Sequence, residues 1–333
     1  MKKIIYLILL FFVISCNTKN TDFIISFGSC NKQYVENVLW QEIAKNNSKV
    51  WIWGGDNVYS DTDSMPKLKA DYEMQWKQKG YKEFVNSVDV LATWDDHDYG
   101  LNDGGVEFYK KKESQQEFLD FFKIPKDDIR RNREGVYYTK TYKTNQGSIK
   151  VLVLDTRYFR TGLTLATDTT KRYQPNKYGE GTILGEQQWK WFQDELSNST
   201  ANFNVIVSSI QFLSYKHGFE SWGTFPYEVD KMKNIIKSSN AKGVLILSGD
   251  RHISEFSATK IDGLDFPLVD FTSSGLTHSY TSFKGEENPE RIGKVIPEIS
   301  FGILKFDFKA KKITMQMRGK DNTLQQEHIQ SYN

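Results

Sequence analysis

Short apolar runs recur along the chain, and each of them ends in a cluster of polar residues. Six of these runs are rich in β-forming residues: FIISFG (23–28), KVWIW (49–53), VDVLAT (88–93), IKVLVL (149–154), NVIVSS (204–209) and GVLILS (243–248). A short continuous apolar run bounded by turn residues is typical of a strand that is buried on both faces. The pattern therefore predicts sheets whose central strands are covered on both sides.

Helical periodicity occurs between these runs. In residues 186–199, Trp189, Phe192 and Leu196 fall on one face of a helix, and residues 227–239 show a similar pattern. Alternation of strands and helices predicts an α/β layered fold. Residues 299–319 instead alternate apolar and polar positions, which predicts an antiparallel hairpin near the C-terminus.

The first 16 residues, MKKIIYLILLFFVISC, have the pattern of an export signal. Lys2 and Lys3 precede an apolar core that is too short to span a bilayer. The ending VISC resembles the lipobox of bacterial lipoproteins, in which the cysteine is lipidated and becomes the first mature residue. We therefore expect residues 1–16 to be a lipoprotein signal peptide, Cys16 to anchor the protein to a membrane of the cell envelope, and residues 22–333 to form one domain. A plain secretory signal and an uncleaved helix are the alternatives.

Cys30 directly follows the first predicted strand and is the other of the chain's two cysteines. If Cys16 carries lipid, Cys30 has no disulfide partner within the chain. A leftover cysteine in an exported protein is explained by an inert buried thiol, by a partner chain or by a metal ion. The cysteine pattern alone leaves these three explanations open.

Charge and motifs argue against two classes of function. The formal net charge of +2 falls to near neutrality once the two lysines of the signal are removed, so no nucleic-acid-binding surface is indicated. A serine nucleophile is not expected either, because the chain has no GxSxG motif and the SSG at 273–275 has the pattern of a loop.

Acidic and imidazole side chains gather where the predicted strands end. In an open α/β sheet, ligands bind beyond the carboxyl ends of the strands. A single aspartate there is usually a turn former or a helix cap, and a single histidine is usually a satisfied core residue. Several buried anions in one place are costly without a cation, and the simplest cation is a metal ion. The residues at this edge are Cys30, Asp56, Tyr59, Asp95, Asp96, His97, Asp155, Arg157, Asp250 and His252.

Seven segments occur in an order that resembles one known family. They are GSCNKQ, WIWGGDNVYSD, TWDDHDYGLN, LDTRYFR, LGEQQWKWF, SSIQF and LILSGDRHISE. The order is similar to that of the PhoD-like alkaline phosphatases (alkaline phosphatase D), which belong to the calcineurin-like metallophosphoesterases. The resemblance implies a four-layer α/β/β/α sandwich, in which helices flank two mixed sheets. It also implies an iron(III) and calcium centre with a cysteine thiolate and a tyrosinate among its ligands, although other divalent metals are possible.

The resemblance assigns metal binding to seven residues: Cys30, Asp56, Tyr59, Asp96, Asn102, Asp250 and His252. Asp56 matches a carboxylate that bridges two metals, because one carboxylate can bind through both of its oxygens. Tyr59 matches a phenolate, which favours a hard trivalent ion. Asp250 and His252 match a metal-binding pair in GDRH, and Asn102 is expected to reach a calcium ion.

The remaining roles concern the substrate. His97 falls at the position that protonates the leaving group or contacts phosphate. Arg157 and Arg251 are candidates for neutralising phosphate oxygens, and pairing of a guanidinium with a structural aspartate is the equal alternative.

The implied reaction is hydrolysis of a phosphate mono- or diester by metal-activated water. Two other functions remain open. The first is that of a phospholipase or nucleotide phosphodiesterase, because the same site accepts diesters. The second is that of a catalytically inactive metal-binding surface lipoprotein.

Overall fold

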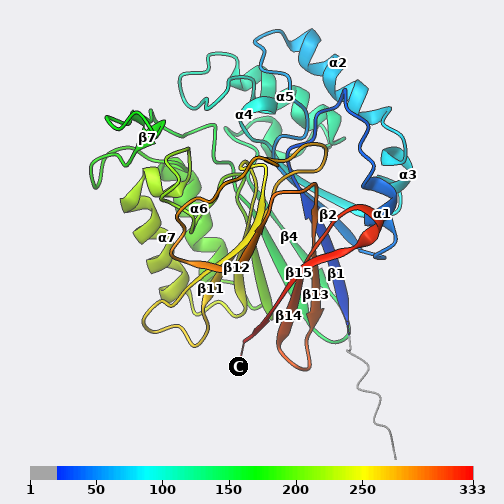
Figure 1. The fold of residues 1–333 in the computed structure, drawn as a ribbon, viewed down its shortest axis with the longest axis vertical. Coiled ribbons are helices and arrows are strands. Elements are labelled where there is room, and N and C mark those ends of the chain that lie inside the picture. The colour runs from blue at the N-terminus through cyan, green and yellow to red at the C-terminus, as the bar shows by residue number, and fades with distance from the viewer. Residues whose placement is uncertain (1–20, 333) are drawn as a thin grey trace, which may run out of the picture.

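Two mixed β-sheets pack face to face, and helices cover both outer faces (Figure 1). The computed structural model describes residues 21–332. The predicted signal peptide and Cys16 lie outside the described residues. Within the described part of the chain, no helix is both long enough and apolar enough to cross a bilayer.

The first sheet has six strands in the order β15-β14-β13-β1-β2-β3. These strands are β1 (Phe23–Gly28), β2 (Val50–Gly54), β3 (Asp89–Thr93), β13 (Phe301–Asp307), β14 (Lys312–Arg318) and β15 (Leu324–Ser331). β1, β2 and β3 are parallel, whereas β13 runs antiparallel to β1 and to β14. The predicted C-terminal hairpin is thereby confirmed.

The second sheet has seven strands in the order β12-β10-β11-β9-β8-β5-β4. These strands are β4 (Tyr138–Lys143), β5 (Ser148–Val153), β8 (Phe203–Val207), β9 (Val244–Ser248), β10 (Ser254–Thr259), β11 (Leu268–Ser273) and β12 (Arg291–Ile296). The central strands β5, β8, β9 and β11 are parallel. The loop predicted at 273–275 is only partly found, because Ser273 is the last residue of β11 and Ser274 forms an isolated parallel bridge with Ser29. A separate two-stranded ribbon joins β6 (Thr164–Leu165) to β7 (Tyr173–Gln174).

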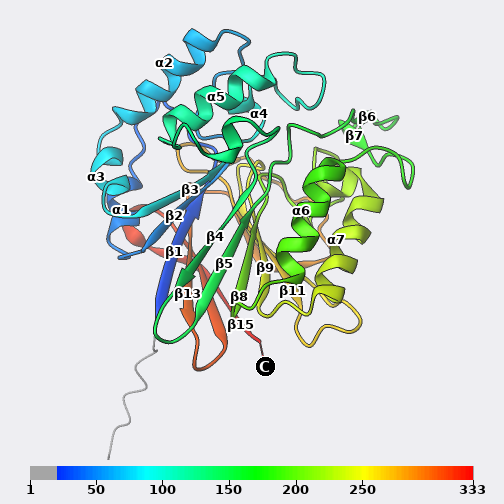
Figure 2. The same ribbon diagram turned by 180° about the vertical axis from the view of Figure 1, so that it is seen from behind.

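The helices fall into two groups, one on each side of the sandwich (Figure 2). The first group is α1 (Trp40–Ala44), α2 (Met65–Trp76), α3 (Tyr81–Val85), α4 (Asp96–Tyr99) and α5 (Lys111–Phe121). The second group is α6 (Gly185–Ser197) and α7 (Pro226–Ser239). Three 3-10 turns lie at Ile129–Arg131, Trp222–Thr224 and Lys320–Asn322.

The buried apolar residues form three clusters that match the three interfaces of a four-layer fold. Strand β2 shows how one sequence serves two of them, because successive side chains of a strand point to opposite faces. Val50 and Ile52 join the cluster between the sheets. Trp51 and Trp53 join the cluster beneath the first group of helices. The third cluster packs the second sheet against α6 and α7. The four-layer sandwich predicted from the family resemblance is confirmed.

Candidate metal centre

Four of the predicted ligands have a backbone conformation that residues other than glycine rarely adopt. Cys30, Asp56, Asp250 and His252 have φ values of 61°, 51°, 70° and 54°. They directly follow the parallel strands β1, β2 and β9. Such left-handed conformations cost free energy in residues other than glycine, and they cluster at functional sites where the surrounding fold enforces them. The strain therefore marks this end of the sandwich.

Gly55 explains how Asp56 reaches its position. Its φ is +97°, and a Cβ atom there would lie 2.7 Å from Cβ of Asp95 and 2.9 Å from Cβ of Ser209. Only glycine lets the loop after β2 pass this close to residues from both sheets. The GGD sequence thus turns Asp56 toward the space where the sheet ends meet.

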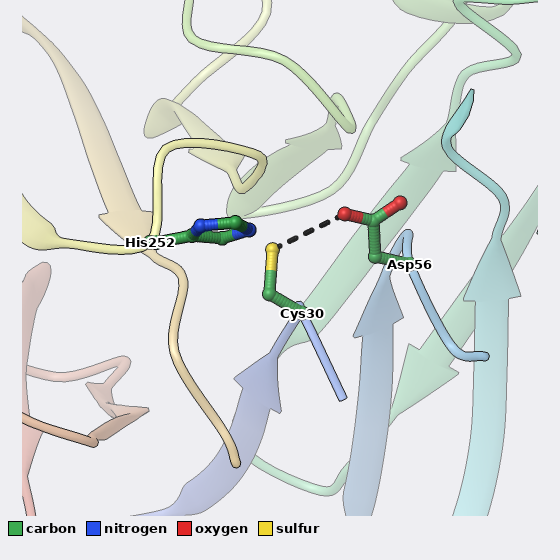
Figure 3. A group of neighbouring side chains, drawn as sticks. All are labelled: Cys30, Asp56 and His252. Atoms are coloured by element: carbon green, nitrogen blue, oxygen red, sulfur yellow. Dashed lines mark hydrogen bonds between the residues drawn. The ribbon is translucent and has the colours of Figure 1, made fainter. Parts of the chain in front are cut away.

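Cys30, Asp56 and His252 converge on one point (Figure 3). One ligand atom from each lies within 4.8 Å of the others, and Cys30 Sγ donates to Asp56 Oδ2 at 3.3 Å. The hydroxyl of Tyr59 donates to Asp56 Oδ2 at 3.1 Å and lies 2.9 Å from Nε2 of His252. A thiol, a phenol, a carboxylate and an imidazole make a donor set that suits a transition-metal ion.

Two further donor groups adjoin the first one. Asp56, Asp96 and His97 form one, and Asp95, Asp96 and Asp250 form the other. Asp56 belongs to two groups, and Asp96 also belongs to two. The three groups are therefore continuous, and the geometry fits a centre in which a carboxylate is shared between neighbouring cations.

Burial makes this cluster costly in the absence of a cation. It raises the pKa of Cys30 to about 11 and that of Asp250 to about 7, and it raises the pKa of Asp56 and of Tyr59 well above their ordinary values. It also lowers the pKa of His252 to about 4, which leaves the imidazole neutral, as a metal ligand must be. A bound metal ion would reverse the cost by favouring thiolate, phenolate and carboxylate.

His97 is placed at the edge of the cluster. Its Nδ1 lies 2.7 Å from Oδ2 of Asp61, and its ring stacks on Tyr59 with centroids 4.0 Å apart. Burial disfavours the imidazolium, but the charges of Asp56 and Asp96 and the contact with Asp61 together raise the pKa of His97 to about 11. The carboxylates around it thus favour the protonated form of the ring. Asp61 was missed as a functional residue, although it stands in the quoted segment WIWGGDNVYSD.

The acidic residues of the WDDHD segment have two roles. Asp95 and Asp98 stabilise the local fold, and Asp96 belongs to the donor cluster. Asp95 caps α4, and its backbone N–H donates to Oδ1 of Asp98 at 2.7 Å. Asp98 also accepts from the side chain of Asn57 at 2.5 Å. This short capped helix fixes the direction of Asp96 and His97.

Arg157 lies in a buried ion-pair network. It contacts Asp95, and its Nη1 lies 2.5 Å from Glu220 Oε2. Arg160 binds the same carboxylate through Nε at 2.8 Å. Asp155 is also structural, since it accepts hydrogen bonds from Trp94 and from backbone N–H groups. Of the two roles considered for Arg157, this geometry favours pairing with structural carboxylates over contact with phosphate oxygens. Glu220 was missed because nothing in its local sequence marks it.

Asn102 and Arg251 complete the set of predicted site residues. Asn102 is exposed, and it is the backbone N–H of the next residue, Asp103, that donates to Asp96 Oδ2 at 2.7 Å. The contact with Asp96 is thus made by the neighbour of Asn102. Arg251 pairs with Glu286 at 2.8 Å and lies 4.2 Å from the ring centroid of Phe219.

Two residues that the sequence analysis did not single out lie beside the cluster. The ring of His278 lies 4.4 Å from that of His252 and 5.0 Å from that of Tyr59. The ammonium group of Lys32 lies over the Tyr59 ring at 5.4 Å. Lys32 belongs to the quoted segment GSCNKQ, whereas His278 stands in no segment that the sequence marks.

Comparison with known proteins agrees with this geometry. The family model for the PhoD-like phosphatase matches residues 23–317. Alkaline phosphatase D of Bacillus subtilis (strain 168) is 26% identical over 212 residues, which cover 56% of this chain and 36% of that protein. The matched part therefore spans about a third of the length of this curated relative.

Solved structures share the fold. The structure of PhoD superposes with a TM-score of 0.74 at 18% identity, over 94% of this chain and 69% of that chain. A dimetal phosphatase from Danio rerio gives a TM-score of 0.56 at 10% identity, over 94% of this chain and 100% of that one. GAP50, the anchor in the inner membrane complex of Plasmodium, gives a TM-score of 0.61 at 13% identity, over 94% of this chain and 90% of that chain. These likenesses establish the arrangement of two mixed sheets with flanking helices.

Proposed function

Because the chain belongs to the PhoD-like phosphatase family, we propose that it is a phosphoric ester hydrolase that cleaves phosphate mono- and/or diesters with bound metal ions. One observation carries the proposal. Asp56 is shared by two buried donor groups at the strand ends, in a left-handed backbone conformation that is uncommon for residues other than glycine. A carboxylate that binds two metal ions would account for the position of Asp56 in both groups.

We propose iron(III) and calcium as the metals. Cys30, Tyr59 and His252 would hold the iron, with Asp56 shared between the two metals, because thiolate and phenolate are anions that a strong Lewis acid keeps deprotonated. Asp96 and Asp250 offer the oxygen ligands that calcium prefers. When bound, the metals would supply an activated water and neutralise charge on the phosphoryl group.

The residues of the chain have separate tasks in this proposal. His97 holds a proton, and Asp61 fixes its ring through Nδ1, which leaves Nε2 to protonate the leaving oxygen. Arg157 holds Asp95, and Asp95 caps the short helix that carries Asp96 and His97. Arg157 is therefore a positioning residue.

The decisive experiment measures metal and activity on one sample. Mass spectrometry should find iron and calcium in the purified native protein. The protein should hydrolyse p-nitrophenyl phosphate, its bis ester, or both, and a chelator should abolish the reaction. The ratio of the two rates separates a monoesterase from a phosphodiesterase. A metal-loaded protein that cleaves neither ester would support the inactive binding lipoprotein instead.

We also propose that the protein is exported and anchored by lipid at Cys16 in the cell envelope. The support is the sequence alone, namely VISC after a short apolar core with two lysines before it. Changing Cys16 to serine should move the protein from the membrane fraction to the soluble fraction. An unchanged membrane partition, together with no lipid labelling of the natural protein, would contradict the anchor.

A further inference from the structure

Lys32 and His278 adjoin the donor cluster without belonging to any of its three groups. Both contact the ring of Tyr59, which itself reaches Asp56 and His252 through its hydroxyl. The Tyr59 ring therefore links both side chains to the donors. Their chemistry differs from that of the cluster, because a lysine offers only hydrogen-bond donors and a positive charge.

Thr277 ties the two residues together. Its Oγ1 accepts from the backbone N–H of Lys32 at 2.8 Å and lies 3.2 Å from Nδ1 of His278. We assign the Thr277 hydroxyl proton to its nearer acceptor, Nδ1 of His278 at 3.2 Å, over the backbone oxygen of Cys30 at 3.5 Å, which places the proton of the neutral ring on Nε2. This Nε2 is buried and has no hydrogen-bond partner among the described residues. A buried donor without an acceptor is rare in folded proteins, and at a binding site it points to a missing ligand atom.

Lys32 differs from other basic side chains near the strand ends. Arg157 and Arg251 are paired with carboxylates, and so are Lys67 and Lys216. Lys32 is half-buried and forms no ion pair with any residue that the structure describes. Its charge is therefore free to meet an anion beside Tyr59.

We propose that Lys32 and His278 bind non-bridging oxygens of the substrate's phosphoryl group, and that they make the site favour a dianionic monoester over a monoanionic diester. The inference rests on the proposed function and adds a charge preference to it. A lysine beside the reacting group attracts a dianion more strongly than a monoanion, since the attraction scales with the product of the charges. The Nε2–H of His278 supplies a second, neutral donor.

The test compares three ligands, namely p-nitrophenyl phosphate, its bis ester and inorganic phosphate, in four proteins. Lys32→Met should raise the KM for p-nitrophenyl phosphate and the Kd for inorganic phosphate by about 10- to 100-fold, as expected for the loss of a charged hydrogen bond. The KM for the bis ester should change by less than about 3-fold, because a monoanion depends less on the lysine. Lys32→Arg should keep most of the preference. Lys216→Met is the matched control, since this lysine is already paired with Glu287.

The histidine is tested in the same way. His278→Ala should weaken inorganic phosphate binding, and His278→Gln should restore part of it, because the glutamine amide places a donor near Nε2. Metal content and thermal unfolding are measured for each variant, so that loss of the centre or of the fold is seen directly. These variants should retain the natural metal content.

Two outcomes separate this inference from the proposed function. If the natural protein hydrolyses esters but Lys32→Met leaves the KM for the monoester and the Kd for phosphate unchanged, the inference is wrong and the proposed function stands. If the natural protein hydrolyses neither ester, the proposed function fails, and the phosphate titration alone decides the inference. Equal loss on monoester and diester would overturn the proposed charge preference.

Discussion

Two neighbouring regions hold buried carboxylates, and they neutralise them in different ways. In the arginine network, Arg157 and Arg160 face Asp95 and Glu220, so the protein supplies its own cations. In the donor cluster, the carboxylate of Asp56 faces a thiol and a phenol. The first region is complete as folded, whereas the second gains its counter-charge from a bound metal ion.

The titration of adjacent acids shows how local this difference is. Asp96 resists the effect of burial because Arg157 and His97 lie near it, and its pKa falls to about 2. Asp250 has weaker compensation, and burial raises its pKa to about 7. Asp96 and Asp250 belong to the same donor group, so two acids of one candidate metal site differ in pKa according to the charged side chains near each of them.

The largest effect is expected at the carboxylate shared between donor groups. Asp56→Asn removes one anionic oxygen, so the variant should lose metal together with activity on every ester tested. Metal analysis and hydrolysis rates on one preparation check this. Asp270→Asn is the matched control, because Asp270 is buried in β11 but belongs to none of the three donor groups. A variant with full metal content and near-natural turnover would show that Asp56 is not a bridge.

His97 differs from both regions. It carries a positive charge, but we assign it to contact with the substrate. His97→Asn should lower turnover by roughly 10²- to 10⁴-fold while the metal stays bound, as expected for the loss of proton donation. Aryl phosphates with good leaving groups should lose least, since their leaving oxygen needs little protonation. An equal loss on good and poor leaving groups would mean that His97 only positions phosphate. Asp61→Asn should give a smaller loss with the same dependence on the leaving group.

Disruption of the arginine network should lower the stability of the protein more than its catalytic activity. Arg157→Met leaves Asp95 and Glu220 buried without their partner, and the free energy of unfolding should fall by about 3–5 kcal/mol. Arg172→Met is the control, because its pair with Asp103 is partly exposed and should contribute less than about 1 kcal/mol. Denaturant melts measure both. Lost phosphate affinity with unchanged stability would instead restore Arg157 as a phosphate ligand.

The contrast between the regions also explains what could be predicted from the sequence. The buried parallel strands were predictable because their apolar runs are continuous, and the convergence of Cys30, Asp56 and His252 follows from strands that end at one edge. The pairing of Arg157 with Glu220 was not predictable, because Glu220 lies 63 positions further along the chain, in a loop without periodicity. The edge strands β4 and β12 are half-exposed and lack a continuous apolar run.

Residues that act through space were missed for the same reason. Asp61 and His278 acquire their neighbours only when separate loops meet, so the contacts that give them a role are not visible in the adjacent sequence, even though Asp61 ends the segment WIWGGDNVYSD. Asn102 is a different case. It was expected at the metal because of its place in a motif, and in the structure its side chain is exposed while the backbone N–H of the next residue, Asp103, donates to Asp96.

The smallest structural change tests the donor cluster most directly. Cys30→Ser changes a single atom of the side chain, and the hydroxyl of Ser274, 3.0 Å from Sγ, can hydrogen-bond a serine there, so stability should change little. If Cys30 and Tyr59 bind iron(III), the natural protein should be coloured by charge transfer from these ligands. The variant should lose that colour, and its affinity for iron should fall by at least roughly the 10- to 100-fold that loss of a supporting contact costs.

Thiol chemistry gives an independent reading of the same residue. A thiol reagent should leave Cys30 unmodified in the native protein and modify it once the metal has been stripped, because a metal-bound thiolate is not available to the reagent. The comparison with an inert buried thiol is direct, since such a thiol would be equally protected with and without metal. Normal activity and normal metal content in Cys30→Ser would place Cys30 among the structural residues, and the donor cluster would then rest on Asp56, Tyr59 and His252 alone.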